Sequence, residues 1–129
     1  ATERRDRRFL GTCVGGELHE IGVRMVADFF EMDGWDTYYM GANTPEASVL
    51  ETIASQNVDV IGISATMTFH VRQVASLIAS IRNAYGLSPQ ILVGGYPFNL
   101  SSGLWARIGA DGYAPDADSA VSLANDLVG

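Results

Sequence analysis

The 129-residue chain contains no lysine, and its eight basic residues are all arginine. Without lysine, no Schiff base can form on this chain and a phosphate-binding loop of the lysine type is excluded. No apolar run approaches the roughly 20 residues that span a bilayer, so we expect no membrane partner. The single cysteine, Cys13, cannot form an internal disulfide, and a reducing, cytoplasmic setting is therefore expected.

Charge is distributed unevenly along the chain. The net charge is −7, yet half of the arginines lie in the first eight residues, and from Phe9 onward four arginines face thirteen acidic residues. An acidic body repels phosphate backbones, so direct binding of nucleic acid is not expected. We interpret residues 1–8 as the remnant of a linker and residues 9–129 as one domain.

Apolar runs typical of strands alternate with helical patterns. We expect strands at 9–14, 37–40, 58–64 and 90–93 and a weak one at 112–113. The expected helices carry apolar stripes at Ile21, Met25, Val26, Phe29 and Phe30, at Val49, Leu50 and Ile53, and at Val71, Val74, Leu77, Ile78 and Ile81. A short helix is expected at 100–108 and a last helix at 117–128, and caps are expected at Thr44 and Asp116. This alternation predicts a doubly wound, flavodoxin-like or Rossmann-like parallel sheet of five strands with helices on both faces.

Ligands of such sheets bind beyond the carboxyl ends of the strands, and the residues at those ends exclude two common occupants of the fold. A phosphoacceptor receiver needs an acid where the third strand ends, but Ser64 stands there. A dinucleotide-binding domain needs Gly-x-Gly-x-x-Gly after the first strand, whereas residues 15–22 read Gly-Gly-Glu-Leu-His-Glu-Ile-Gly.

The turn after the first strand holds the residue with the most distinctive chemistry, His19. A lone loop histidine is most often an ordinary surface residue, but Glu17 can hydrogen-bond the ring nitrogen that faces away from a metal. Small residues at the other strand ends, Ser64, Thr66, Gly94 and Gly95, indicate a slot between strands. Each also has a plainer interpretation, because hydroxyls satisfy nearby backbone groups and a Gly-Gly pair suits a turn.

The pattern Glu17-x-His19-x-x-Gly22, then Ser64-x-Thr66, then Gly94-Gly95, resembles the cobalamin-binding domain over about residues 8–128. The resemblance implies that His19 binds cobalt in place of the cofactor's own base and that the displaced nucleotide tail runs along the slot. Ser64 would extend the hydrogen-bond chain from His19. The cofactor-binding residues that it implies are Glu17, Leu18, His19, Glu20, Ile21, Gly22, Ser64, Thr66, Gly94, Gly95, Tyr96 and Tyr113.

Glu17 and Thr66 depart from the Asp and Leu that are usual in the enzymes of this family, and they look more like the cobalamin-dependent regulators. We therefore interpret the chain as the sensory module of a regulator, with light response as one form. The alternatives are a corrinoid carrier of a methyltransferase system, the cobalamin domain of a mutase, and a haem-binding sensor if His70 approaches His19. Each needs a protein partner or a helical cap above the corrin ring, and we expect no catalysis by this chain alone.

Overall fold

The computed structural model describes residues 4–14, 20–41 and 44–128, and at residues 4–6, 20 and 21 the backbone alone. The strands described are β1 (Arg4–Val14), β2 (Trp35–Met40), β3 (Val60–Ala65), β4 (Gln90–Gly94) and β5 (Gly112–Tyr113). They form one parallel sheet in the order β2-β1-β3-β4-β5. The predicted five-stranded, doubly wound parallel sheet is confirmed, with its reversal of strand order beside β1.

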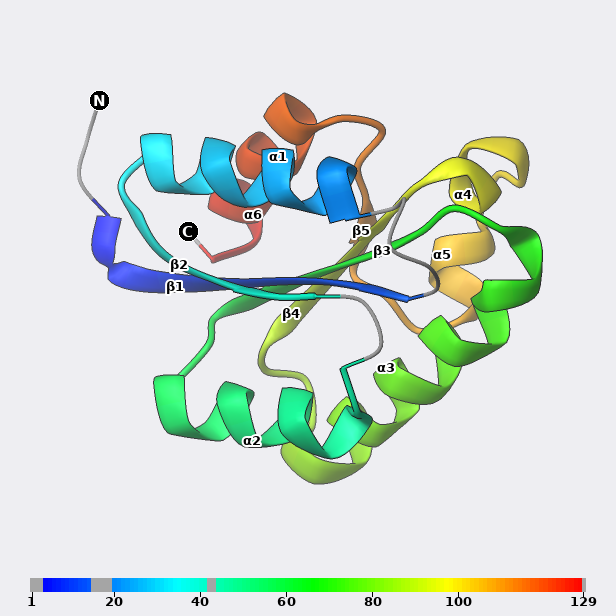
Figure 1. Cartoon of the computed structure of the whole chain (residues 1–129), viewed down its shortest axis with the longest axis horizontal. Helices are drawn as coiled ribbons and strands as arrows, with labels where there is room; N and C mark the ends of the chain where they lie inside the picture. Colours follow the sequence, from blue (N-terminus) through cyan, green and yellow to red (C-terminus); the bar gives the residue numbers. More distant parts are fainter. Residues whose placement is uncertain (1–3, 15–19, 42–43, 129) are drawn as a thin grey trace.

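Helices cover both faces of this sheet (Figure 1). On one face lie α1 (Glu20–Met32) and α6 (Ala117–Val128), and on the other lie α2 (Glu46–Gln56) and α3 (Val71–Tyr85). The 3-10 turn η2 (Thr68–His70) precedes α3, and the short helices α4 (Tyr96–Leu100) and α5 (Leu104–Arg107) follow β4. No helix in these described ranges is long and apolar enough to cross a membrane.

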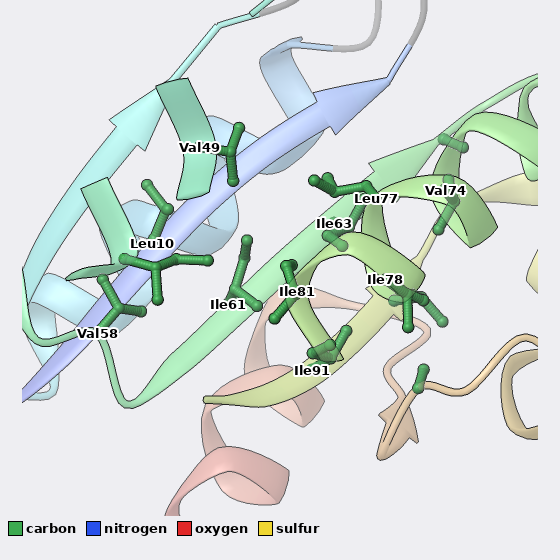
Figure 2. Packing of buried hydrophobic residues seen from close by; sticks show 14 of the residues in the cluster. Leu10, Val49, Val58, Ile61, Ile63, Val74, Leu77, Ile78, Ile81 and Ile91 are labelled. Carbon is green, nitrogen blue, oxygen red and sulfur yellow. The ribbon is translucent and has the colours of Figure 1, made fainter. Parts of the chain in front are cut away.

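Consecutive residues of a strand pack into the hydrophobic clusters on opposite faces of the sheet, because side chains alternate between the faces. Leu10 joins the cluster beneath α2 and α3, where Ile61, Ile78 and Ile91 are also buried (Figure 2). Phe9, one residue earlier, joins the second cluster, beneath α1 and α6. Burial on both faces explains why β3 and β4 read as nearly continuous apolar runs in the sequence.

Strand β1 begins earlier than predicted, at Arg4 rather than Phe9. The Arg8 amide donates to Asp59 Oδ2 at 2.9 Å, and its guanidinium donates to the Gln56 carbonyl at 2.8 Å. Arg7 donates to the carbonyl of Val128 at 3.0 Å. These partners hold two arginines at the edge of the fold, and hydrophobic periodicity gave no sign of them.

The predicted apolar stripe of α1 is partly wrong. Met25 and Phe29 are exposed at 53% and 37%, whereas Val23, Ala27 and Phe30 are buried. The Phe30 ring stacks on Phe9 with centroids 3.7 Å apart, which fixes the rotation of the helix. At about 100° per residue, Met25 then lies roughly 200° from Val23, on the solvent side.

Of the two predicted caps, one is confirmed and one is wrong. The Ser119 amide donates to Asp116 Oδ1 at 2.8 Å, so Asp116 caps α6 as predicted. Thr44 does not cap α2, because its hydroxyl donates to the carbonyl of Gly41 and extended Pro45 occupies the cap position. The short helix predicted at 100–108 corresponds to α5 at Leu104–Arg107, and the structure adds an unpredicted helix, α4, at Tyr96–Leu100.

Candidate functional site

A cavity of about 280 Å³ opens between α1 and α6 on the α1–α6 face of the sheet, near the carboxyl ends of β3 and β4. We call it the slot. Its described lining residues are Phe9, Gly22, Val23, Met25, Val26, Gly62, Ile63, Ser64, Leu92, Val93, Gly94, Gly95, Ala114, Pro115, Asp116, Ala117 and Ala120.

Small residues on one face of the sheet create this space. Strand alternation places Gly62 and Ser64 of β3 on the same face as Val60, which belongs to the cluster beneath α1 and α6. In the neighbouring strand, Gly94 pairs with Ser64. At the carboxyl edge Ser64 and Gly94 therefore leave open a layer that larger side chains would fill, whereas the Phe9 ring fills the space beside Gly62.

The turn after β4 approaches β3 too closely for any side chain. Gly95 has φ +110°, and a Cβ on it would lie 1.8 Å from the carbonyl oxygen of Ala65. A Cβ on Gly94 would lie 3.0 Å from the carbonyl oxygen of Ala114. Both glycines are therefore required by close backbone packing as well as by the space in the slot.

The helical side of the slot is also built from small residues. Ala117 and Ala120 of α6 line it together with Ala114, which lies just before this helix. On α1, Gly22 has no atom within 4 Å of where its Cβ would lie, so the space beside it is open. A slot bounded by glycine and alanine backbones suits a flat group inserted edgewise.

Polar groups stand at the rim of the slot. Ser64 is half-buried at the end of β3, and Asp116 is exposed at the start of α6. The hydrogen bond from the Ser119 amide lowers the pKa of the Asp116 carboxyl below its ordinary value. The interior is apolar, and the groups that can orient a ligand lie at its entrance.

The structure brings together four of the predicted site residues, Gly22, Ser64, Gly94 and Gly95, around the slot. Glu20 and Ile21 begin α1, with side chains that are not described. The remaining predicted residues of the first turn, Glu17, Leu18 and His19, lie outside the described residues.

Three other predicted residues are not among the described residues that line the slot: Thr66, Tyr96 and Tyr113. Tyr113 lies on the opposite face, where it packs against the cluster beneath α2 and α3 and its hydroxyl donates to Asn99 Oδ1. The structure thus separates Tyr113 from the slot. Tyr96 is exposed at the start of α4, and Thr66 is half-buried just beyond β3.

His70 was the alternative candidate for a metal ligand. It is half-buried at the end of η2, and its ring centroid lies 4.4 Å from that of Phe69. Within the part of the chain that the structure describes, no group of three or more His, Cys, Asp or Glu side chains is arranged to hold a metal ion.

Sequence reasoning missed the contribution of α6 and of Gly62. The signal was present as Ala117-x-x-Ala120, a spacing that places two small residues on one face of the helix predicted at 117–128, with Ala114 just before it. Alternation within β3 would similarly have placed Gly62 beside Ser64 on one face of the sheet.

The volume of the slot limits the size of the group that it can hold. A volume of about 280 Å³ lies just below the roughly 300–1,000 Å³ of pockets that hold a whole drug-sized ligand. The slot is therefore suited to one flat heterocyclic arm of a larger molecule, and the close approach of Gly95 to Ala65 holds its walls in place.

Comparisons with known proteins identify relatives of this chain. The dimethylamine corrinoid protein of Methanosarcina barkeri is 34% identical over 118 residues, which are 89% of this chain and 54% of that protein. The monomethylamine corrinoid protein of the same organism superposes with a TM-score of 0.80 at 25% identity, over 93% of this chain and 57% of that one.

A cobalamin-binding protein from Desulfitobacterium hafniense has the same fold, with a TM-score of 0.86 at 20% identity over 97% of this chain and 60% of that one. The chain thus spans between 54% and 60% of the length of these proteins. The model of the B12 binding domain matches residues 7–122. The chain belongs to the B12-binding domain family, and its cofactor is a corrinoid.

Proposed function

We propose that this chain is the corrinoid-carrying module of a methyl-transfer system, and that it holds cobalamin with His19 on the cobalt and the nucleotide tail in the slot. The observation that carries the proposal is the slot itself, a narrow apolar cavity of about 280 Å³ at the carboxyl edge of the sheet. The names of the relatives, dimethylamine and monomethylamine corrinoid proteins, support a carrier over a sensor and a corrinoid over haem.

The connectivity supports His19 as the ligand. Strand β1 ends at Val14, which pairs with Ala65 at the end of β3, and α1 begins at Glu20 and contributes Gly22 to the slot. Residues 15–19 join these two ends, so His19 belongs to the connection between the sheet edge and the wall of the slot.

When bound, a corrinoid supplies a cobalt centre that can accept a methyl group from one partner and release it to another. This chain's own part is to bind and orient. His19 would donate a ring nitrogen to the metal, and Glu17 would accept a hydrogen bond from the other ring nitrogen, which fixes the tautomer and raises the basicity of the imidazole. The slot would hold the displaced tail away from the metal.

The regulatory interpretation depends on Glu17, Thr66 and the acidic body of the chain. Glu and Asp can serve the same role beside a ligand histidine, so Glu17 does not favour a sensor over a carrier. A carrier needs an exposed edge over which partner proteins can exchange positions, and Tyr96 and Leu100 are exposed at 56% and 59% after β4. A protein partner above this edge is part of the proposal.

The test uses the full-length protein loaded with corrinoid, a methylamine carrying an isotopic label in its methyl group, and a cognate methyltransferase. We expect the label to be recovered with the protein only when corrinoid and methyltransferase are both present. A protein that takes up no label, but whose assembly state changes with adenosylcobalamin and illumination, would be a sensor instead.

A further inference from the structure

The floor of the slot is formed by one aromatic ring that covers a pair of glycines. Gly11 of β1 lies opposite Gly62 of β3 in the parallel register. A Cβ on Gly62 would lie 2.8 Å from Cζ of Phe9, and a Cβ on Gly11 would lie 3.2 Å from Cε2 of the same ring. The Phe9 ring therefore occupies the space that side chains at both positions would otherwise fill.

The ring is fixed from the other side by an aromatic stack. Phe30 of α1 lies parallel to Phe9, with centroids 3.7 Å apart and an interplanar angle of 7°. Trp35 meets Phe30 edge-on at 5.1 Å and 87°. The Trp35 indole N–H donates to Asn125 at 3.2 Å, and Asn125 donates to Asp33 at 3.0 Å. These contacts hold Phe9 in one orientation.

Phe9 also lines the slot, although its side chain is fully buried. In the register of β1 and β3 it pairs with Val60, which precedes Gly62 and Ser64 on the same face. The entrance is marked by Gly94 at the end of β4 and by Gly95 and Asp116 beyond the strands. The backbone of Phe9 thus lies farther from the entrance than Gly11 and Gly62. Its ring closes the inner end of the slot.

We propose that Phe9 determines specificity for the lower base of the corrinoid, because it sets how far a heterocyclic base can enter the slot. The inference rests on the proposed function, in which the tail occupies this cavity. Compact bases such as dimethylbenzimidazole would fit above the ring. A base longer by one fused ring would meet a wall that its aromatic stack keeps from moving aside.

The size of the effect follows from the behaviour of closed apolar pockets. A single methylene group that such a pocket cannot accommodate changes selectivity by roughly 10–200-fold. A fused benzo ring adds more than one methylene, so we expect wild type to prefer cobalamin over naphthimidazolyl cobamide by at least about 10-fold in Kd. Shortening the side chain at position 9 should reduce that preference.

The experiment measures Kd by equilibrium dialysis for cobalamin, naphthimidazolyl cobamide and cobinamide, which has no base. Phe9→Leu is the main variant, and Phe30→Leu is the matched control. Phe30 belongs to the same stack but is not among the described residues that line the slot. Gly62→Ala tests the opposite change, a smaller slot in place of a larger one, because the added Cβ would displace the Phe9 ring.

We expect Phe9→Leu to lower the preference for cobalamin over naphthimidazolyl cobamide by about 10-fold. Phe30→Leu removes the support of the Phe9 ring but leaves the ring itself, so it should lower the preference by clearly less than Phe9→Leu does. Gly62→Ala should weaken cobalamin binding, and cobinamide binding should change little throughout. The proposal is overturned if wild type binds both complete cobamides equally, or if Phe9→Leu and Phe30→Leu change the preference alike. Equal affinity of wild type for cobalamin and cobinamide would instead contradict tail binding, and with it the proposed function.

Discussion

Gly95 approaches Ala65 so closely that a Cβ on the glycine would lie 1.8 Å from the alanine carbonyl oxygen. The two residues join the turn after β4 to the end of β3, and both strand ends border the slot. The backbone conformation of Gly95, with φ +110°, is itself one that other residues rarely adopt. The entrance of the slot is therefore built on a contact between two backbones.

Gly95→Ala should destabilise the fold severely. The unfavourable φ alone costs roughly 1–3 kcal/mol, and the overlap with backbone adds to it. Gly103→Ala is the matched control, because Gly103 also has positive φ, at +78°, but no atom within 4 Å of its missing Cβ. Urea unfolding should show a clearly larger loss for Gly95→Ala, and equal losses would contradict the close approach.

Gly22→Leu should block the slot without harming the fold. The position is exposed on α1, lines the slot and has open space around it, so the leucine can extend into the cavity. Replacing glycine in a helix should also stabilise the chain, by up to about 1 kcal/mol. We expect cobalamin affinity to fall by 10-fold or more, about 1.4 kcal/mol, while cobinamide affinity is retained. Unchanged cobalamin affinity would place the tail elsewhere.

Asp111→Asn should weaken the fold far from the slot. Asp111 Oδ2 accepts hydrogen bonds from the Arg82 guanidinium and from the Ile91 amide, both at 2.7 Å, and so links α3 to β4. Because the side chains of Arg82 and Asp111 are both partly exposed, the free energy of unfolding should fall only modestly, by about 1–2 kcal/mol in urea unfolding. Cobalamin affinity should not change, which separates this variant from those at the slot.

Asp116 should make α6 sensitive to acid. Its pKa is lowered in the folded chain, so its stabilising contribution is present above the ordinary value of 3.8 and is lost as pH falls through the lowered pKa. Asn also caps helices but does not titrate. Wild type and Asp116→Asn should therefore differ in stability near pH 7 and converge toward pH 2. A constant difference across that range would exclude the ionised cap.

The sheet was predictable because parallel strands buried on both faces leave long apolar runs, as at Val60 and Ile61. The rotation of α1 was not, because the stack of Phe30 on Phe9 is a tertiary contact that outweighs the pattern of Met25 and Phe29. The start of β1 was missed for a similar reason. Its arginines carry no apolar signal, and their partners come from elsewhere in the chain.

The candidate site was predictable at Gly94 and Gly95 because the Gly-Gly pair occurs together with Ser64 at a neighbouring strand end, although the pair alone would equally suit a turn. Tyr113 was predicted to be near the tail from its place at the end of the fifth strand, but its side chain lies on the opposite face of the sheet. Predicting the face on which the Tyr113 side chain lies would have required the register of β5 against β4. A strand of two residues has too short a sequence pattern to establish that register.

The central claim is that His19 binds the cobalt of a bound corrinoid. Electron paramagnetic resonance of the chain loaded with cob(II)alamin tests it most directly, because a nitrogen ligand splits the cobalt signal. Cobalamin carries its own base, so cobinamide loaded in the same way serves as the control without one. We predict nitrogen splitting in wild type with either corrinoid, and its loss with cobinamide in His19→Ala. Identical cobinamide spectra from wild type and His19→Ala would contradict the account.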